Sequence, residues 1–177
     1  MEEGTSKQKV MRVFFKYPSR AHYLMGISRE IKLSHTSVNI ILKKLIKKHI
    51  VTEKIEKRGK RNFPMYYANI NEDFKLLKKR SNIQKMEDCG LVKFLSDNLM
   101  PQSIILFGSY VRGEDITESD IDIFVESATR NIDISKFEKK LNKKIQLHFK
   151  KNINTLPLEL KNNIINGIKL YGRIELE

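Results

Sequence analysis

The stretch 106–125 reads Leu-Phe-Gly-Ser-Tyr-Val-Arg-Gly-Glu-Asp-Ile-Thr-Glu-Ser-Asp-Ile-Asp-Ile-Phe-Val. An apolar run over 103–107 ends at Gly108-Ser109, and a second apolar run covers 121–125. This pattern predicts a strand, a turn that opens a short helix, and a second strand. Glycine lets the backbone approach a ligand closely, and a serine hydroxyl together with helix N–H groups can hold phosphate oxygens. Gly108 and Ser109 are therefore candidate phosphate-binding residues.

Two aspartates, Asp120 and Asp122, alternate at the start of the second strand. Side chains two residues apart on a strand point to the same side, so both carboxylates should face one point. Mg²⁺ prefers carboxylate oxygens combined with phosphate oxygens of a substrate. Two such ions can clamp the attacking and leaving oxygens of a nucleotidyl transfer. The aspartates are thus candidate metal ligands and catalytic residues.

The spacing Gly-Ser-x10-Asp-x-Asp closely resembles the motif of the minimal nucleotidyltransferases of the DNA polymerase β superfamily. The resemblance covers residues 92–173 and includes Arg112-Gly113 and Ser119, which the family often carries. It implies a small mixed β-sheet flanked by helices. It also implies Mg²⁺ as the cofactor and a nucleoside triphosphate, expected to be ATP, as the substrate. The residues that it assigns to nucleotide binding are Gly108, Ser109, Arg112 and Ser119, and those that it assigns to the metal and to catalysis are Asp120 and Asp122.

One position departs from the family pattern. The family carries a third carboxylate inside the next strand, which here reads Lys-Ile-Gln-Leu-His-Phe over 144–149 and has Gln146 at the matching position. An amide cannot act as a base, and it removes one negative charge from a metal site. His148, Asp133 and Glu126 are alternative proton acceptors, although Asp133 is better explained as a residue at a helix N-terminus. We therefore expect weakened or absent transfer, with nucleotide or metal binding retained.

The first 70 residues show a different pattern. Apolar spacing predicts a helix over 7–15 that Ser6 caps, a short helix over 26–32, and a helix over 34–48 with one apolar stripe. Two strand-like runs follow, over 50–57 and 62–70, joined by a turn at Gly59. Two helices joined by a tight turn and followed by a hairpin are typical of a winged helix-turn-helix.

Residues 26–51 resemble the winged-helix part of archaeal and bacterial transcriptional regulators. Residues 1–72 hold 16 Lys and Arg against 6 Asp and Glu, whereas residues 73–177 hold 18 against 15, so the basic excess is confined to the first part. A helix with a polar outer face fits the major groove of duplex DNA, and a basic hairpin tip can lie at the minor groove. The candidate DNA-binding residues are His35, Thr36, Asn39, Lys43, Lys44, Lys47, Arg58, Lys60 and Arg61.

The segment 71–99 is predicted to be helical, with a break at Ser81-Asn82 or at Cys89-Gly90, and Pro101 ends it. We therefore expect an α+β chain in three parts. Residues 1–70 form a winged helix-turn-helix, residues 71–100 form linking helices, and residues 101–177 form a nucleotidyltransferase-like domain. The linking segment is also the expected interface if the protein is a homodimer.

Several functions fit these parts. The first is a DNA-binding transcriptional regulator with a nucleotide-sensing or dimerising domain. The second is an active nucleotidyltransferase that modifies a protein or RNA partner, in a toxin–antitoxin manner that the family resemblance implies. The third is an RNA-binding protein, because basic faces contact the backbone of either polymer. A basic helix face can also be merely solvated, and winged helices also serve as protein–protein modules.

Other features limit the setting of the protein. Cys89 is the single cysteine, so no intrachain disulfide can form, and no zinc-ligand spacing is present. No segment approaches the apolar length of a membrane span, and no signal-peptide pattern follows the acidic start. The expectation is a cytoplasmic protein without a membrane partner.

Overall fold

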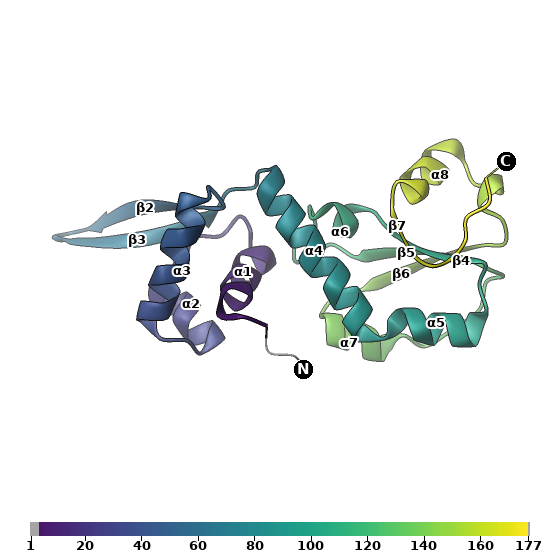
Figure 1. Ribbon diagram of the computed structural model, residues 1–177, viewed down its shortest axis with the longest axis horizontal. Coiled ribbons are helices and arrows are strands. Elements are labelled where there is room, and N and C mark those ends of the chain that lie inside the picture. Colours follow the sequence, from purple (N-terminus) through teal and green to yellow (C-terminus); the bar gives the residue numbers. More distant parts are fainter. Residues whose placement is uncertain (1–3, 177) are drawn as a thin grey trace. The chain divides into compact units, whose positions relative to one another are not determined.

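The computed structural model describes residues 4–176, apart from the side chain of Arg58. It is a mixed α+β structure whose described part has eight α-helices and two sheets (Figure 1). The chain divides into two compact units at Lys75 and Leu76, and this boundary falls inside the fourth helix. No helix in the described part combines the length and the apolar content needed to cross a membrane.

The first unit contains three helices and a three-stranded sheet. Its elements are α1 (Ser6–Lys16), β1 (His22–Tyr23), α2 (Leu24–Ile31), α3 (His35–Lys47), β2 (Val51–Arg58) and β3 (Arg61–Ala68). The strands are antiparallel in the order β1-β3-β2, and Gly59, with φ +60°, closes the hairpin between β2 and β3. The three helices and the hairpin predicted from the apolar spacing are therefore present, within a few residues of the expected bounds.

Two details at helix ends follow from local chemistry. The side chain of Thr5, rather than that of Ser6, caps α1: it accepts a hydrogen bond from the backbone N–H of Gln8, whose own side chain bonds back to Thr5. The prediction of Ser6 as the cap was wrong by one residue. Helix α3 begins at His35 and is capped by Ser34, whose hydroxyl accepts from the N–H of Ser37 at 3.2 Å.

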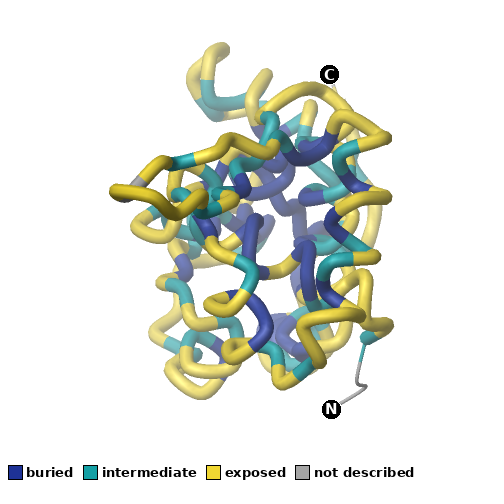
Figure 2. Tube along the Cα trace, turned by 90° about the vertical axis from the view of Figure 1, so that its left-hand side faces the viewer, coloured by how far each residue is buried: buried dark blue, intermediate teal, exposed yellow. Residues whose placement is uncertain are grey.

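The core of the first unit lies between its helices and the sheet. Side chains from each helix are fully buried there, including Phe14 of α1, Ile27 of α2 and Leu42 of α3. Figure 2 colours the Cα trace by burial and shows buried stretches in the interior and exposed ones outside. Helix α3 buries Val38, Leu42 and Leu45, which fall on one side of the helix at spacings of three and four residues. Its opposite side is left to solvent.

The second unit begins within α4 (Glu72–Cys89), and α5 (Leu91–Leu99) follows directly. Gly90 separates the two helices with φ +84°, so the break occurs at the second of the two predicted places. These helices occupy the segment predicted to be a linker. From Leu76 onward, however, they belong to the second unit and contribute Met86, Leu91 and Leu95 to its core.

The remaining elements build a four-stranded mixed sheet with helices on both faces. They are β4 (Ser103–Phe107), α6 (Ser109–Arg112), β5 (Ile121–Glu126), α7 (Ser135–Leu141), β6 (Ile145–Lys150), a 3₁₀ turn η1 (Ile153–Thr155), α8 (Leu158–Ile165) and β7 (Ile168–Gly172). The strand order is β6-β5-β4-β7; β5 and β6 are parallel, and the other pairs are antiparallel.

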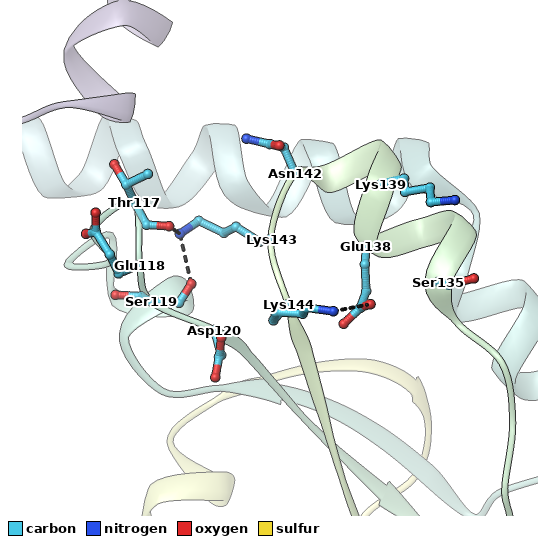
Figure 3. A pocket seen from close by; sticks show the side chains of 10 residues that line it. All are labelled: Thr117, Glu118, Ser119, Asp120, Ser135, Glu138, Lys139, Asn142, Lys143 and Lys144. Carbon is cyan, nitrogen blue, oxygen red and sulfur yellow. Dashed lines mark hydrogen bonds and ion pairs between the residues drawn. The ribbon is translucent and has the colours of Figure 1, made fainter.

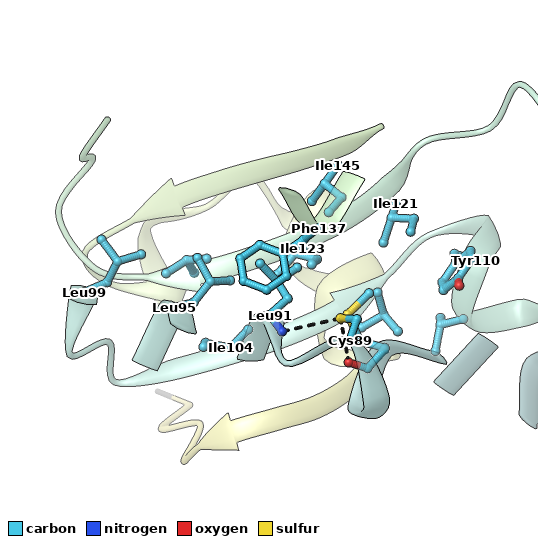
Figure 4. Close-up of a cluster of buried hydrophobic side chains, with 14 residues drawn as sticks. Cys89, Leu91, Leu95, Leu99, Ile104, Tyr110, Ile121, Ile123, Phe137 and Ile145 are labelled. Carbon is cyan, nitrogen blue, oxygen red and sulfur yellow. Dashed lines mark hydrogen bonds between the residues drawn. The ribbon is translucent and has the colours of Figure 1, made fainter. Parts of the chain in front are cut away.

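Each face of this sheet has its own core. One face packs against α4, α5 and α7 through a large cluster that includes Leu95, Ile104 and Ile123 (Figure 4). The opposite face carries a smaller cluster that contains Phe107 of β4, Phe124 of β5 and Ile164 of α8. Because alternate residues of a strand face opposite sides, Asp120 and Asp122 share the face of Phe124. The sheet therefore presents both carboxylates on the side of α8.

Candidate functional site

The bend after β4 brings Gly108 against Asp122. Gly108 has φ +77° and precedes the first turn of α6, which begins at Ser109. A Cβ atom on Gly108 would lie 2.5 Å from Oδ2 of Asp122, so any other residue would displace the carboxylate and would also strain the backbone at this positive φ. The structure thus joins the predicted phosphate-binding bend and one of the predicted metal ligands in a single place.

Both aspartates are half-buried and receive side chains from the neighbouring strand. The Nε2 of Gln146 donates a hydrogen bond to Oδ2 of Asp120 at 2.6 Å. The Nε2 of His148 lies 3.2 Å from Oδ1 of Asp122, and the His148 ring packs edge-on against Phe107. The parallel register between β5 and β6 causes this pairing, since it places Asp122 beside Gln146 and the alternating residues of both strands on one face.

Gln146 therefore occupies the position at which the family resemblance predicts a third carboxylate. Its amide is exposed, and it neutralises no charge. Where a carboxylate would add negative charge to the site, Gln146 supplies a hydrogen-bond donor that occupies an oxygen of Asp120. The side chains that contact the two carboxylates are consequently one amide, from Gln146, and one imidazole, from His148.

The two other acidic residues considered as substitutes have structural roles. Glu126 is buried at the far end of β5, where its carboxylate accepts from the hydroxyl of Ser103 at 2.8 Å and from the N–H of Ile153 at 2.9 Å. Asp133 accepts from the backbone N–H of Ser135 at the start of α7, and this hydrogen bond holds the pKa of the Asp133 carboxyl below its usual range. Neither carboxylate is available for proton transfer beside Asp120.

The remaining predicted nucleotide-binding residues lie around the same bend. Ser109 is half-exposed at the start of α6. Arg112 is exposed at the end of that helix, where its guanidinium donates to Glu114 at 2.9 Å. The hydroxyl of Ser119 accepts from the backbone N–H of Ile116 at 2.9 Å, so it shapes the loop that leads to Asp120.

That loop is anchored by buried polar residues which the sequence analysis did not identify. The amine of Lys78 and the amide of Asn82, both from α4, reach the carboxylate of Asp115, at 3.3 Å and 2.8 Å respectively. Lys143 ties the same loop from the other side: its amine donates to the carbonyl of Ser119 at 3.0 Å and lies 3.5 Å from Asp115. Burial lowers the pKa of the Lys78 amine, against the attraction of the Asp115 charge.

A signal for this network was present in the sequence. Phe74, Lys78, Asn82 and Met86 recur every four residues, and all four are buried. A lysine and an asparagine inside an otherwise apolar helical stripe require partners, because an unpaired polar group is costly to bury. The network fixes the position of the loop over 114–120, and hence that of Asp120.

We predict that Asp115→Asn lowers the free energy of unfolding by about 3 kcal/mol, because it leaves the buried Lys78 amine without an opposite charge. Urea denaturation followed by circular dichroism measures this change. Glu114→Gln is the matched control: it removes the neighbouring exposed ion pair with Arg112 and should cost less than about 1 kcal/mol. Equal costs for the two variants would contradict the role assigned to Asp115.

A cavity of about 480 Å³ opens beside Asp120 (Figure 3). Its wall combines the loop before β5 with α7 and the turn between α7 and β6. In Figure 3, Lys143 reaches Ser119, and Lys144 reaches Glu138 at 3.2 Å. The residues that line the cavity are Thr117, Glu118, Ser119, Asp120, Ser135, Glu138, Lys139, Asn142, Lys143 and Lys144.

The donor set can be compared with what Mg²⁺ requires. Within residues 4–176, no three His, Cys, Asp or Glu side chains gather closely enough to hold a metal ion by themselves. Mg²⁺ is commonly bound through one or two carboxylates, with substrate phosphates and water completing its shell. Asp120 and Asp122 beside the Gly108 bend fit that pattern, provided that the Gln146 amide releases Oδ2 of Asp120.

The predicted DNA-binding residues lie on the first unit. His35, Thr36, Lys43, Lys44 and Lys47 of α3 are exposed, and Asn39 is half-buried. Lys60 and Arg61, at the tip of the hairpin, are exposed, and the side chain of Arg58 lies outside the described part. No carboxylate among the described residues pairs with Lys43, Lys44 or Lys47, which leaves these charges available to a polyanion.

Comparison with known proteins relates the second unit to a described family. Residues 88–171 match the family described as nucleotidyltransferase domain. A Methanocaldococcus jannaschii protein described as a putative protein adenylyltransferase is 44% identical over 70 residues, which cover 35% of this chain and 70% of that relative.

Two solved structures are also similar. One is a possible transcriptional regulator from Methanosarcina mazei Go1, with 21% identity, 54% of this chain and 78% of that chain covered, and a TM-score of 0.39. The other is a protein of Streptococcus mutans UA159, with 22% identity, 52% and 94% of the two chains covered, and a TM-score of 0.44. The family match and the archaeal relative, together with the geometry of the Gly108 bend, lead to one conclusion: the chain belongs to the nucleotidyltransferase domain family.

Proposed function

We propose that the protein is a DNA-binding transcriptional regulator whose nucleotidyltransferase domain binds a nucleoside triphosphate with Mg²⁺ but transfers nucleotides slowly. The observation that carries this proposal is the 2.6 Å hydrogen bond from the Gln146 amide to Asp120. It places a neutral donor where a transferase of this family needs a third negative group. ATP is the expected triphosphate, since the archaeal relative is described as an adenylyltransferase.

The site retains the parts that bind a nucleotide. Gly108 lets the Asp122 carboxylate lie close against the bend, and the Ser109 hydroxyl and the N–H groups at the start of α6 would hold phosphate oxygens there. Asp120 and Asp122 face the same space and would hold Mg²⁺, which neutralises phosphate charge and activates the phosphorus when bound. Arg112 lies at the end of α6 and can exchange Glu114 for a phosphate oxygen.

Transfer also requires that the attacking hydroxyl lose its proton. In the reaction, an acceptor oxygen bonds to the α-phosphorus, the bond to pyrophosphate breaks, and the acceptor proton passes to a base. An amide such as Gln146 cannot accept that proton. A general base contributes typically about 10²–10⁴-fold to such steps, so its absence alone is enough to make transfer slow.

The first unit supplies the DNA-binding half of the proposal. Helices α2 and α3 with the β2–β3 hairpin have the element order of a winged helix-turn-helix, in which the second helix lies in the major groove. The exposed lysines of α3 and the basic hairpin tip would contact phosphates and release counterions. Residues 71–99 are the proposed interface of a homodimer, because such regulators bind paired half-sites as dimers.

A second candidate function is an active nucleotidyltransferase that modifies a protein or RNA partner. The observation in its favour is the imidazole of His148, which lies 3.2 Å from Asp122 and is about one-third exposed. A neutral imidazole can take the proton of an acceptor hydroxyl while the neighbouring carboxylate stabilises the resulting charge. This candidate predicts that His148→Gln abolishes transfer.

The nucleotide half of the proposal is tested by replacing both aspartates with asparagine. We expect Asp120→Asn with Asp122→Asn to weaken ATP binding at least about tenfold when Mg²⁺ is present, because two metal ligands are lost. In EDTA, the variant should bind ATP as well as the wild type or better, since two negative charges near the phosphates are removed. Isothermal titration calorimetry measures both affinities.

The matched control is Glu118→Gln, which neutralises a nearby exposed carboxylate that lines the cavity beside Asp120. It should leave both affinities unchanged. Wild-type affinity for ATP with Mg²⁺ in the double variant would show that the aspartates do not form the metal site.

A further inference from the structure

One large apolar side chain interrupts the basic face of α3. Ile40 is 50% exposed, although the neighbouring outward positions of the helix are polar or basic. The buried residues of the same helix, Val38, Leu42 and Leu45, account for its attachment to the core. Ile40 is therefore not among the buried residues that hold the helix in place.

The helical repeat puts Ile40 near the centre of the exposed face. At 3.6 residues per turn, Thr36, Ile40, Lys43 and Lys47 fall within roughly 60° of one another around the helix axis. The buried stripe lies on the opposite side. A ligand that approaches the lysines along this face must therefore cover Ile40 as well.

The ligand that suits this combination is duplex DNA read in its major groove. Lysines meet the phosphates at the edges of the groove, and a helix residue at the centre of the face meets the base edges. An apolar side chain offers base edges no hydrogen bond, but it can make contact with the C5-methyl group of thymine. An acidic protein partner would need only the lysines, and burial of Ile40 against its carboxylates would gain nothing.

We propose that Ile40 is a specificity-determining residue that reads the methyl group of thymine in the DNA site. The inference rests on the proposed DNA binding and adds the base class that α3 prefers. Thr36, one turn earlier on the same face, carries a methyl group and a hydroxyl, so the contact can extend to the adjacent base pair.

The test uses the full-length chain and duplexes that it selects from a random library. Each thymine of the selected site is replaced in turn by deoxyuridine, which lacks only the methyl group. We expect one or two positions at which the wild type binds the uracil duplex about fourfold more weakly, the value of one buried methyl group. In Ile40→Ala and Ile40→Gln, binding to the thymine duplex should fall about tenfold, and the thymine-to-uracil ratio at those positions should approach one.

Ile70→Ala is the matched control, because Ile70 is equally exposed but lies outside α3, and it should preserve the ratio. An unchanged thymine-to-uracil ratio in both Ile40 variants overturns the inference. It is also overturned if the weaker DNA binding of these variants is explained by loss of self-association, measured by sedimentation. If the wild type binds no duplex DNA at all, the proposed function fails as well. If Lys43→Glu with Lys47→Glu abolishes DNA binding while the Ile40 variants keep the thymine preference, the proposed DNA binding stands. In that case only the role of Ile40 is refuted.

Discussion

Replacing Gln146 by aspartate is expected to raise the rate of nucleotidyl transfer about 100-fold. The substitution removes the amide that occupies Oδ2 of Asp120 and puts a third carboxylate on the face shared by Asp120 and Asp122. That carboxylate can help to hold the metal and can accept the proton of the attacking hydroxyl. General-base catalysis contributes about 10²–10⁴-fold in enzymes, and the lower end is appropriate here because the surrounding site is not adapted to the new charge.

The measurement is pyrophosphate release from ATP with Mg²⁺, together with the appearance of label from the α-phosphate on protein. Gln146→Leu separates the two causes, since it frees Asp120 without adding a carboxylate and should stay as slow as the wild type. A rate for Gln146→Asp that does not exceed the wild-type rate would contradict the proposed reason for slow transfer. If His148→Gln then abolishes a substantial wild-type rate, the active transferase with a histidine base becomes the better account.

Reversing two charges on α3, in Lys43→Glu with Lys47→Glu, should weaken binding to duplex DNA about 100-fold at physiological salt. Both lysines are exposed on the outer face of the helix, and neither has a carboxylate partner among the described residues. Each lost phosphate contact removes about 0.9 from the slope of log affinity against log salt, so the slope should become shallower by about two. Fluorescence anisotropy at several salt concentrations gives both quantities.

A variant with the same change in net charge controls for the overall field of the protein. Lys151 and Lys169 are exposed in the second unit, and Lys151→Glu with Lys169→Glu should lower the affinity much less. Similar losses in the two double variants would mean that α3 is not the contact surface. Unchanged thermal unfolding of both variants is expected, since none of the four lysines takes part in a core.

Many elements of the fold could be predicted from the sequence because its local patterns agree with one another. The apolar stripe of α3, the turn at Gly59 and the switch to strand periodicity after Pro101 each depend on neighbouring residues, and each is present in the structure. The cap of α1 was misplaced by one residue because threonine and serine both serve as helix caps and stand side by side here; the reciprocal bond between Thr5 and Gln8 places the cap at Thr5. The division of α4 between the two units could not be inferred, since helical periodicity does not reveal which core a helix joins.

Residue spacing alone determined that Asp120 and Asp122 share one face and that a glycine bend precedes them, because strand alternation and the conformational freedom of glycine are local properties. Only the tertiary structure decided what meets those carboxylates. The parallel pairing of β5 with β6 brings Gln146 and His148 to them from a distant part of the chain, and the buried Lys78 and Asn82 reach across to hold the loop that carries Asp120. These contacts depend on strand register and helix packing. Both are determined by interactions between side chains that lie far apart in the sequence.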